Sequence, residues 1–304
     1  MNETDEKTRR ITSAQWGVVA LVVACAAGSI LYKVLIHERL GHSAAMFIGI
    51  PAVLAILLAL APNTRSITGG IVKGITIALL MVAPMLGEGY LCILIASPLF
   101  YAVGILIGAI VDASRRRRNT TLSCVAVFLL PLCLEGVVPE LTFQRAQTVE
   151  VTKVVNTPAL LVEQALAKSP NLSVALPAVL QIGFPKPMQA LGDGLFPGAT
   201  RTVHFSGAEG DPPGDLVMRV SERRKGYLRM ERISDDSKLT QWLQWNQSEI
   251  EWRPVDEFHT RVTWRIGYDR ELDPAWYFAP WERLVVGHAA GYLIDSNATP
   301  TRQQ

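Results

Sequence analysis

The sequence predicts an α-helical membrane bundle of about five spans, followed by an α+β domain in which an antiparallel sheet accompanies a long C-terminal helix. The chain of 304 residues is 49% hydrophobic and 18% charged, with a mean hydropathy of +0.24. This is too apolar for an ordinary globular domain and too charged for a chain buried wholly in a membrane. Residues 16–112 hold only seven charged side chains, whereas residues 139–304 hold 38 of the 56. From Thr148 onward the pattern changes to an alternation of apolar and polar residues. We therefore expect an integral membrane region over 1–138 and a separate folded domain over 146–295.

The membrane region contains five apolar stretches that approach the length of about 20 residues needed to cross a bilayer. Polar turns separate them, among them Gly87-Glu88-Gly89. The fifth stretch is the shortest, and Pro131 and Glu135 interrupt it. The predicted spans lie near residues 16–36, 43–61, 70–86, 89–111 and 122–138.

Small residues recur at a spacing of four within these stretches, as in Ala24 to Gly28 and Gly104 to Gly108. Such pairs let two helix backbones approach closely. We expect them to pack helices of this same chain in preference to forming a dimer.

A run of four arginines, Arg115 to Arg118, lies between the fourth and fifth stretches and orients the bundle. Basic residues flanking membrane spans stay on the cytoplasmic side. With the arginine run inside, Lys7, Arg9, Arg10, Arg65 and Lys73 fall on the same side, nine basic residues in all, against Lys33 and Arg39 outside. Five spans then place the N-terminus in the cytoplasm and the C-terminal domain outside it, in the periplasm, at a bacterial inner membrane. A fifth stretch that did not cross would leave the domain cytoplasmic.

The C-terminal half begins with a strand over 149–155 and two short helices over 158–168 and 173–182. Six segments with period-two alternation follow, at 200–206, 214–221, 226–233, 238–245, 247–253 and 259–268. The last shows the alternation best, with Val262, Trp264, Ile266 and Tyr268 on one face. Asp273-Pro274 then caps a long helix that runs to about Ile294. The remaining residues, 296–304, are expected to form a disordered tail.

This order of strand, two helices, six strands and long helix resembles the START-like superfamily, the SRPBCC group of polyketide cyclases/dehydrases and lipid-transport proteins. The resemblance covers residues 146–295 and includes the segment Asp273-Pro274-Ala275-Trp276-Tyr277-Phe278 that opens the last helix. It implies a helix-grip fold, in which the sheet curls around the last helix. It also implies a cavity for an apolar ligand between the two.

The alternation selects the residues that would line such a cavity. Ligand contact is predicted for eight of them, and solid core is the competing interpretation because large apolar side chains on one face usually pack together. The eight are Met218, Met230, Trp252, Trp264, Ile266, Trp281, Val285 and His288. Further inward-facing candidates are Leu216, Val220, Leu228, Ile250, Val262 and Leu284.

Catalytic and metal-binding patterns are sparse in the sequence. The weak catalytic candidate is His288, because it lies on the helix that would cover the cavity. His37 and His42 are five residues apart, about 140° around a helix, and cannot chelate one ion as a zinc-protease helix does. The four cysteines show neither zinc spacing nor a disulfide framework. No metal site and no cofactor are therefore predicted.

These features favour a membrane-anchored module that binds a hydrophobic small molecule or a lipid, with the lipid bilayer as its second partner. The C-terminal half is close to neutral, with 18 basic and 20 acidic residues, so no nucleic-acid partner is expected. Two alternatives stay open. One is a cyclase or dehydratase acting on an aromatic or polyketide-like substrate, and the other is a membrane sensor or assembly protein.

Overall fold

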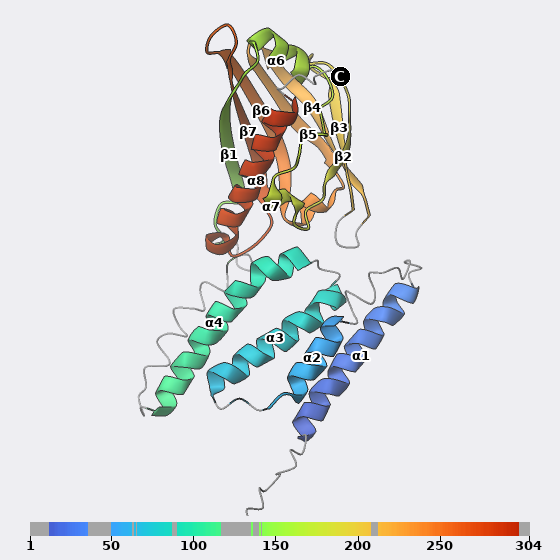
Figure 1. Cartoon of the computed structure of the whole chain (residues 1–304), viewed down its shortest axis with the longest axis vertical. Helices are drawn as coiled ribbons and strands as arrows, with labels where there is room; N and C mark the ends of the chain where they lie inside the picture. The colour runs from blue at the N-terminus through green and yellow to red at the C-terminus, as the bar shows by residue number, and fades with distance from the viewer. Residues whose placement is uncertain are drawn as a thin grey trace, which may run out of the picture. The chain divides into compact units, whose positions relative to one another are not determined.

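The computed structural model describes residues 12–35, 50–62, 64, 66–86, 90–116, 135, 140, 142–207 and 212–297. The chain divides into two compact units, Met1–Ala126 and Val127–Gln304. Figure 1 shows helices alone in the first unit and a sheet with a long helix in the second. Each unit is described by itself.

The described part of the first unit consists of α1 (Ser13–Leu35), α2 (Ile50–Leu60), α3 (Ile67–Leu86) and α4 (Tyr90–Arg116). These helices fall on the first four predicted spans. Among the described residues, Ile93–Ala113 within α4 is the one stretch long and apolar enough to cross a membrane, and three other apolar helices are shorter. The five-span bundle therefore stays a prediction. The fifth stretch apart from Glu135, the His37 to His42 segment, Glu88, Arg117 and Arg118 lie outside the described residues.

Helices α3 and α4 pack closely because α4 presents glycine to α3. A Cβ atom on Gly108 would lie 2.6 Å from the Thr68 Cα atom, and one on Gly104 would lie 2.3 Å from Ile75 Cδ1. The Asp112 carboxylate also accepts hydrogen bonds from the backbone amides of Ile67 and Thr68, both at 3.0 Å, and so caps α3. Packing within the chain is thus confirmed for the Gly104 and Gly108 pair. A Cβ atom on Gly28 would meet nothing within 4 Å.

The second unit is built on a seven-stranded sheet in the order β1-β7-β6-β5-β4-β3-β2, with every neighbouring pair antiparallel. Helix α8 runs along the curled sheet (Figure 1) and contacts β1 and β7. This arrangement fits the predicted helix-grip fold. The strands are β1 (Ala146–Val155), β2 (Pro187–Leu191), β3 (Thr200–Phe205), β4 (Gly214–Arg224), β5 (Tyr227–Asp235), β6 (Leu243–Pro254) and β7 (Thr260–Arg270). The helices are α6 (Ala159–Leu166), α7 (Ala178–Gln181), the short 3-10 helix η4 (Lys238–Gln241) and α8 (Ala275–Asn297).

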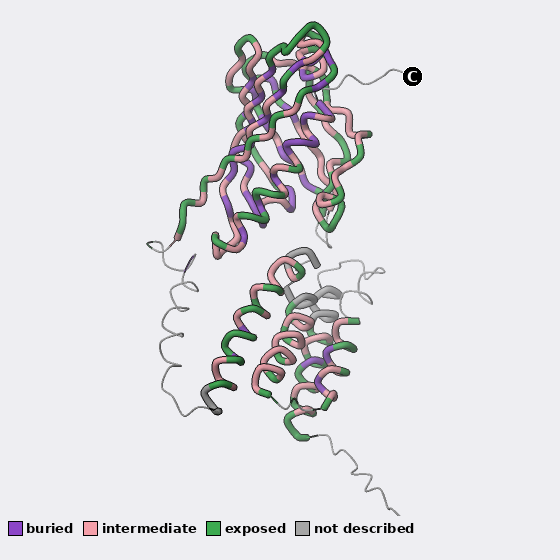
Figure 2. Tube along the Cα trace, turned by 60° about the vertical axis from the view of Figure 1, so that its left-hand side comes forward, coloured by how far each residue is buried: buried purple, intermediate pink, exposed green. Residues whose placement is uncertain are grey.

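The core of this unit follows the predicted alternation. Val262, Trp264, Ile266 and Tyr268 of β7 are all buried, and buried and exposed positions alternate along the strands in Figure 2. Val286, Ala290 and Ile294 of α8 complete the cluster. Lys153 on β1 ties down the far end of α8, since its Nζ donates to Gly291 O at 2.9 Å and to the Asp295 carboxylate at 2.7 Å.

The strand count agrees with the prediction, but two errors offset each other. Strand β2 was missed, because Pro187 and an exposed Met188 place it at the sheet edge, where a strand needs no continuous alternation. The segments 238–245 and 247–253, predicted as two strands, form η4 followed by the single strand β6. The predicted disordered tail is also wrong at its start, since α8 continues to Asn297.

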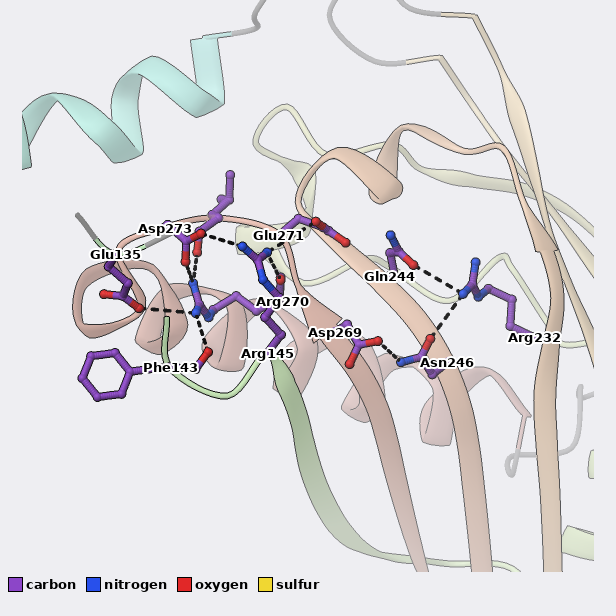
Figure 3. Close-up of polar contacts among 11 residues, drawn as sticks. Glu135, Phe143, Arg145, Arg232, Gln244, Asn246, Asp269, Arg270, Glu271 and Asp273 are labelled. Carbon is purple, nitrogen blue, oxygen red and sulfur yellow. Dashed lines mark hydrogen bonds and ion pairs between the residues drawn. The ribbon is translucent and has the colours of Figure 1, made fainter. Parts of the chain in front are cut away.

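A bulge explains why β6 reads as two strands. Trp245 pairs with Tyr268 and Gln247 pairs with Gly267, so Asn246 is an extra residue. Buried positions therefore change parity, with Trp245 and Ser248 both facing the core. The Asn246 side chain donates a hydrogen bond to the Asp269 carboxylate at 2.8 Å (Figure 3), which holds the bulge in place.

Candidate functional site

An apolar cavity of about 150 Å³ opens between the inner face of the sheet and α8. Six elements supply most of its wall: the segment that carries α7, strands β2, β3 and β4, the start of β6, and α8. The lining residues are Pro170, Leu172, Leu176, Leu180, Phe184, Pro185, Pro187, Ala190, Leu191, Arg201, Thr202, Val203, Phe205, Leu216, Met218, Met230, Leu239, Leu243, Trp245, Ser248, Trp264, Val285, Val286, Ala289, Tyr292, Leu293 and Asn297.

The cavity wall combines small and large side chains. Ser248, which follows the β6 bulge, and Ala289 on α8 line it together with bulky groups such as Trp264. Protein interiors are normally packed to the density of an organic crystal, with few voids larger than a water molecule. A cavity of this size therefore exceeds ordinary packing defects. An engineered apolar cavity of similar volume in another protein binds benzene. This cavity is therefore large enough for a small aromatic molecule.

The structure brings four of the eight predicted ligand-contacting residues to the cavity wall. Met218, Met230, Trp264 and Val285 line it, as does Leu216 from the wider set. Trp252 and Ile266 are buried at 3% and 0% exposure but belong to the solid core. Ligand contact by the four lining residues stays a prediction.

The prediction for α8 was placed about one residue out of phase. Trp281 is 44% exposed, and Leu284 and His288 are exposed as well. The cavity face instead carries Val285, Val286, Ala289, Tyr292 and Leu293. One residue corresponds to about 100° of helix rotation. Trp281 was predicted to face inward, but the structure exposes it and buries the next residue, Glu282. His288 is exposed and is not among the residues that line the cavity.

Sequence reasoning also missed Arg201, the only charged side chain in the cavity wall among the described residues. It is 7% exposed. Its Nη2 atom donates to the carbonyl oxygens of Leu166, the last residue of α6, and Gly194. Its Nε atom is buried and has no hydrogen-bond partner among the described residues. Burial lowers the pKa of the Arg201 guanidinium, with the charge of Asp193 acting in the opposite direction, yet an arginine keeps its proton at neutral pH.

A second polar group, centred on Arg270, fixes the start of α8 (Figure 3). Arg270 is fully buried and lies beside the carboxylates of Asp273 and Glu135. Glu135 Oε1 also accepts a hydrogen bond from the Ala275 amide at 2.9 Å, which caps the helix. Arg145 completes the group by donating to Asp273 at 2.8 Å and to Arg270 O at 3.0 Å. Asp273, predicted as a simple helix cap, therefore serves as a carboxylate partner for two arginines.

Glu282, about two turns further along α8, and Tyr268 of β7 are two more buried polar residues, and no hydrogen bond joins their side chains. Glu282 is 6% exposed, and burial raises its pKa to about 7, although the charge of Arg270 opposes that shift. Burial also raises the pKa of Tyr268, to which the charge of Glu282 contributes. Both residues lie outside the cavity wall, so we assign them to the stability of the domain.

Among the described residues, no group of three or more His, Cys, Asp or Glu side chains is arranged to hold an ion. Cys25 lies in α1 and is a free cysteine.

No protein-family model matches this sequence, and no curated protein matches it either. Several solved structures are similar to the second unit. The Zhui aromatase/cyclase from Streptomyces sp. R1128 shares 15% identity over 49% of this chain and 89% of its own, with a TM-score of 0.33. Norcoclaurine synthase from Thalictrum flavum shares 14% identity over 49% and 88%, with a TM-score of 0.31. Major latex-like protein 151 from Panax ginseng shares 9% identity over 49% and 99%, with a TM-score of 0.29.

Similarity at these identities and TM-scores does not indicate a function. The strand order and the cavity of this protein define its class. The second unit is a curled antiparallel sheet with a long C-terminal helix and an apolar cavity between them.

Proposed function

We propose that the C-terminal domain is a START-like module that binds a small hydrophobic molecule in the cavity between its sheet and α8. The observation that carries the proposal is the cavity itself, whose wall is almost entirely aliphatic, aromatic or proline side chains. Small-molecule sites are concave and mostly apolar, with few polar groups. The volume of about 150 Å³ favours a small aromatic molecule or part of an acyl chain over an entire phospholipid.

The composition of the wall favours binding over acid–base chemistry. Its titratable side chains are Arg201 and Tyr292. Arginine stays protonated at neutral pH, and burial raises the pKa of Tyr292 above its ordinary value near 10. A general acid or base works best with a pKa close to the operating pH. The cyclase or dehydratase alternative would therefore need a group other than His288.

A photoactivatable probe tests the proposal on the full chain in membranes. The probe is the benzyl alcohol that carries a trifluoromethyl diazirine, which is small, aromatic and neutral. We expect saturable cross-links in cavity peptides, such as residues 285–293 of α8, besides non-saturable labelling of the apolar helices. Labelling of the apolar helices alone, with no saturable component in the C-terminal domain, would remove the proposal.

We further propose that the first unit anchors the chain in a bacterial inner membrane and that the domain lies on the extracytoplasmic side. Apolar side chains such as Leu94 and Phe100 on α4 are exposed in the chain alone, as expected for a surface that faces lipid. The distribution of basic residues supports the orientation.

The position of Glu135 restricts how the chain can cross. Because Glu135 caps α8, a crossing from the arginine run must be completed within residues 119–134, sixteen residues. As an α-helix these cover about 24 Å, against about 30 Å of hydrocarbon. The proposal therefore requires a short crossing in a locally thinned bilayer.

The sensor alternative also has one observation in its favour. Glu135 lies within the predicted fifth span, near its end, and caps the first turn of α8, while residues further along α8 line the cavity. One helix thus connects Glu135 to the cavity wall. If the chain is a sensor, Glu135→Gln, which keeps an oxygen acceptor for the Ala275 amide but removes the charge beside Arg270, will leave probe binding intact and abolish the cellular response. A pure binding module will show no such loss.

A further inference from the structure

We infer that the ligand of this cavity carries an anionic oxygen group, such as a carboxylate, which Arg201 and Trp264 recognise. This inference rests on the proposed function, because it describes the ligand of the same cavity. Two polar atoms in residues of the wall carry it, and both are hydrogen-bond donors.

The Arg201 side chain is the first of these. Its Nη2 atom is used by the carbonyl oxygens of Leu166 and Gly194, which suits a structural role at the end of α6. That role leaves the Nε atom buried without a partner. Arg201 forms no ion pair among the described residues; the charge of Asp193 acts on its guanidinium and opposes the effect of burial on its pKa only in part. Buried charges are ordinarily paired, because an isolated charge in apolar surroundings is strongly disfavoured.

The Trp264 indole is the second. Trp264 lines the cavity and is 2% exposed, and its Nε1 atom has no hydrogen-bond partner among the described residues. The other indole in the wall, that of Trp245, donates to Ser248 Oγ at 3.1 Å. A buried indole N–H usually finds an acceptor. Trp264, whose N–H has none among the described residues, differs in this from Trp245.

The wall supplies no acidic group to satisfy these donors. Its remaining polar side chains are Thr202, Ser248, Tyr292 and Asn297, besides Trp245. The missing partner must then come with the ligand, and it must accept hydrogen bonds and carry negative charge to complement a guanidinium. A small hydrophobic acid meets both requirements, since its apolar body fills the cavity and its oxygen atoms supply the acceptors and the negative charge.

A matched pair of photoactivatable probes tests this inference on the full chain in membranes. The pair consists of the trifluoromethyl diazirine benzoic acid and the corresponding benzyl alcohol, compared at equal free concentration and pH 7.5. In the wild-type chain we expect half-saturation of cavity cross-linking at a concentration about tenfold lower for the acid, as for a hydrogen bond to a charged group. Equal half-saturation for acid and alcohol would overturn the inference while leaving the proposed function intact. Saturable labelling by neither probe would instead refute the proposed function.

Two variants locate the preference. Arg201→Gln should abolish the preference for the acid and change the half-saturation of the alcohol less than twofold. Trp264→Phe keeps the ring and removes only the N–H, and it should weaken the acid about threefold without affecting the alcohol. An acid preference that survives both substitutions would show that other groups hold the anion and would contradict the assignment. Should Arg201→Gln fail to fold, the wild-type comparison and Trp264→Phe still decide.

Discussion

At the scale of single residues, the buried Arg270 group is the most sensitive point of the C-terminal domain. The Arg270 side chain has no exposed surface. Its guanidinium forms ion pairs with Asp273 and Glu135 and donates hydrogen bonds to the carbonyl oxygens of Phe143 and Leu272. Removing one partner of a buried ion pair leaves uncompensated charge. We expect Arg270→Ala to lower the free energy of unfolding by about 3–5 kcal/mol, measured by tryptophan fluorescence.

Arg253 provides the matched control for that substitution. It pairs with Glu251 at 3.3 Å, but its side chain is 79% exposed. Exposed ion pairs contribute little, so Arg253→Ala should change stability by less than about 1 kcal/mol. Equal losses for the two substitutions would show that the Arg270 group does not anchor the domain.

Glu282 predicts how stability depends on pH. Its pKa is about 7 in the folded domain and about 4.3 in an unfolded chain. Between these values the folded state binds more protons, so the free energy of unfolding falls as pH rises from 5 to 8. The loss from this one group is at most about 3 kcal/mol. Glu282→Gln should remove most of it and raise the melting temperature at pH 8. A pH dependence identical to that of the wild type would contradict the role assigned to Glu282.

At the scale of elements, the sequence predicted strands well where one face is buried and less well where the backbone changes the pattern. The four positions of β7 predicted to face inward, Val262, Trp264, Ile266 and Tyr268, are all buried, and Gly267 is buried as well. The bulge at Asn246 could not be foreseen, because it is defined by pairing with β7 and not by any local signal. The same limit applies to the face of α8, whose rotation buries Glu282, a residue type that sequence patterns assign to the exposed face.

Helix α8 offers the sharpest test of which face meets the cavity. Ala289 lines it, whereas the neighbouring His288 is exposed. We expect Ala289→Phe to fill the space and abolish saturable probe labelling, at a stability cost of about 1–3 kcal/mol. His288→Phe, which adds a ring at the adjacent position, should leave labelling unchanged. The reverse result would restore the predicted face and the proposed role of His288.

At the scale of the whole molecule, the arginine run and Glu135 bear on the compartment of the domain. The basic residues favour an extracytoplasmic domain, and the Glu135 cap requires that residues 119–134 suffice for the crossing. With reporters fused after Gln304, we expect active alkaline phosphatase and no fluorescence from green fluorescent protein. Fluorescence without phosphatase activity would place the domain in the cytoplasm and show that the fifth stretch does not cross.

The cavity, Arg201 and Trp264 could be foreseen only in part from the sequence. Met218, Met230 and Trp264 follow from strand periodicity, since they are large apolar residues on an inward face. The periodicity does not predict that Arg201 is buried, because a charged residue in a strand is normally assigned to the solvent-exposed face. Its burial depends on carbonyl groups of Leu166 and Gly194, which the fold alone brings together.

The stoichiometry of probe incorporation tests whether the cavity between the sheet and α8 binds a ligand. The full chain in membranes is titrated with the neutral diazirine probe, irradiated and mapped by peptide mass spectrometry. We predict a plateau at one saturable probe per chain, with cross-links in residues 285–293 of α8 and around Met218 and Met230. Incorporation into the C-terminal domain that rises without a plateau, or that maps to exposed residues such as Trp281, would contradict it.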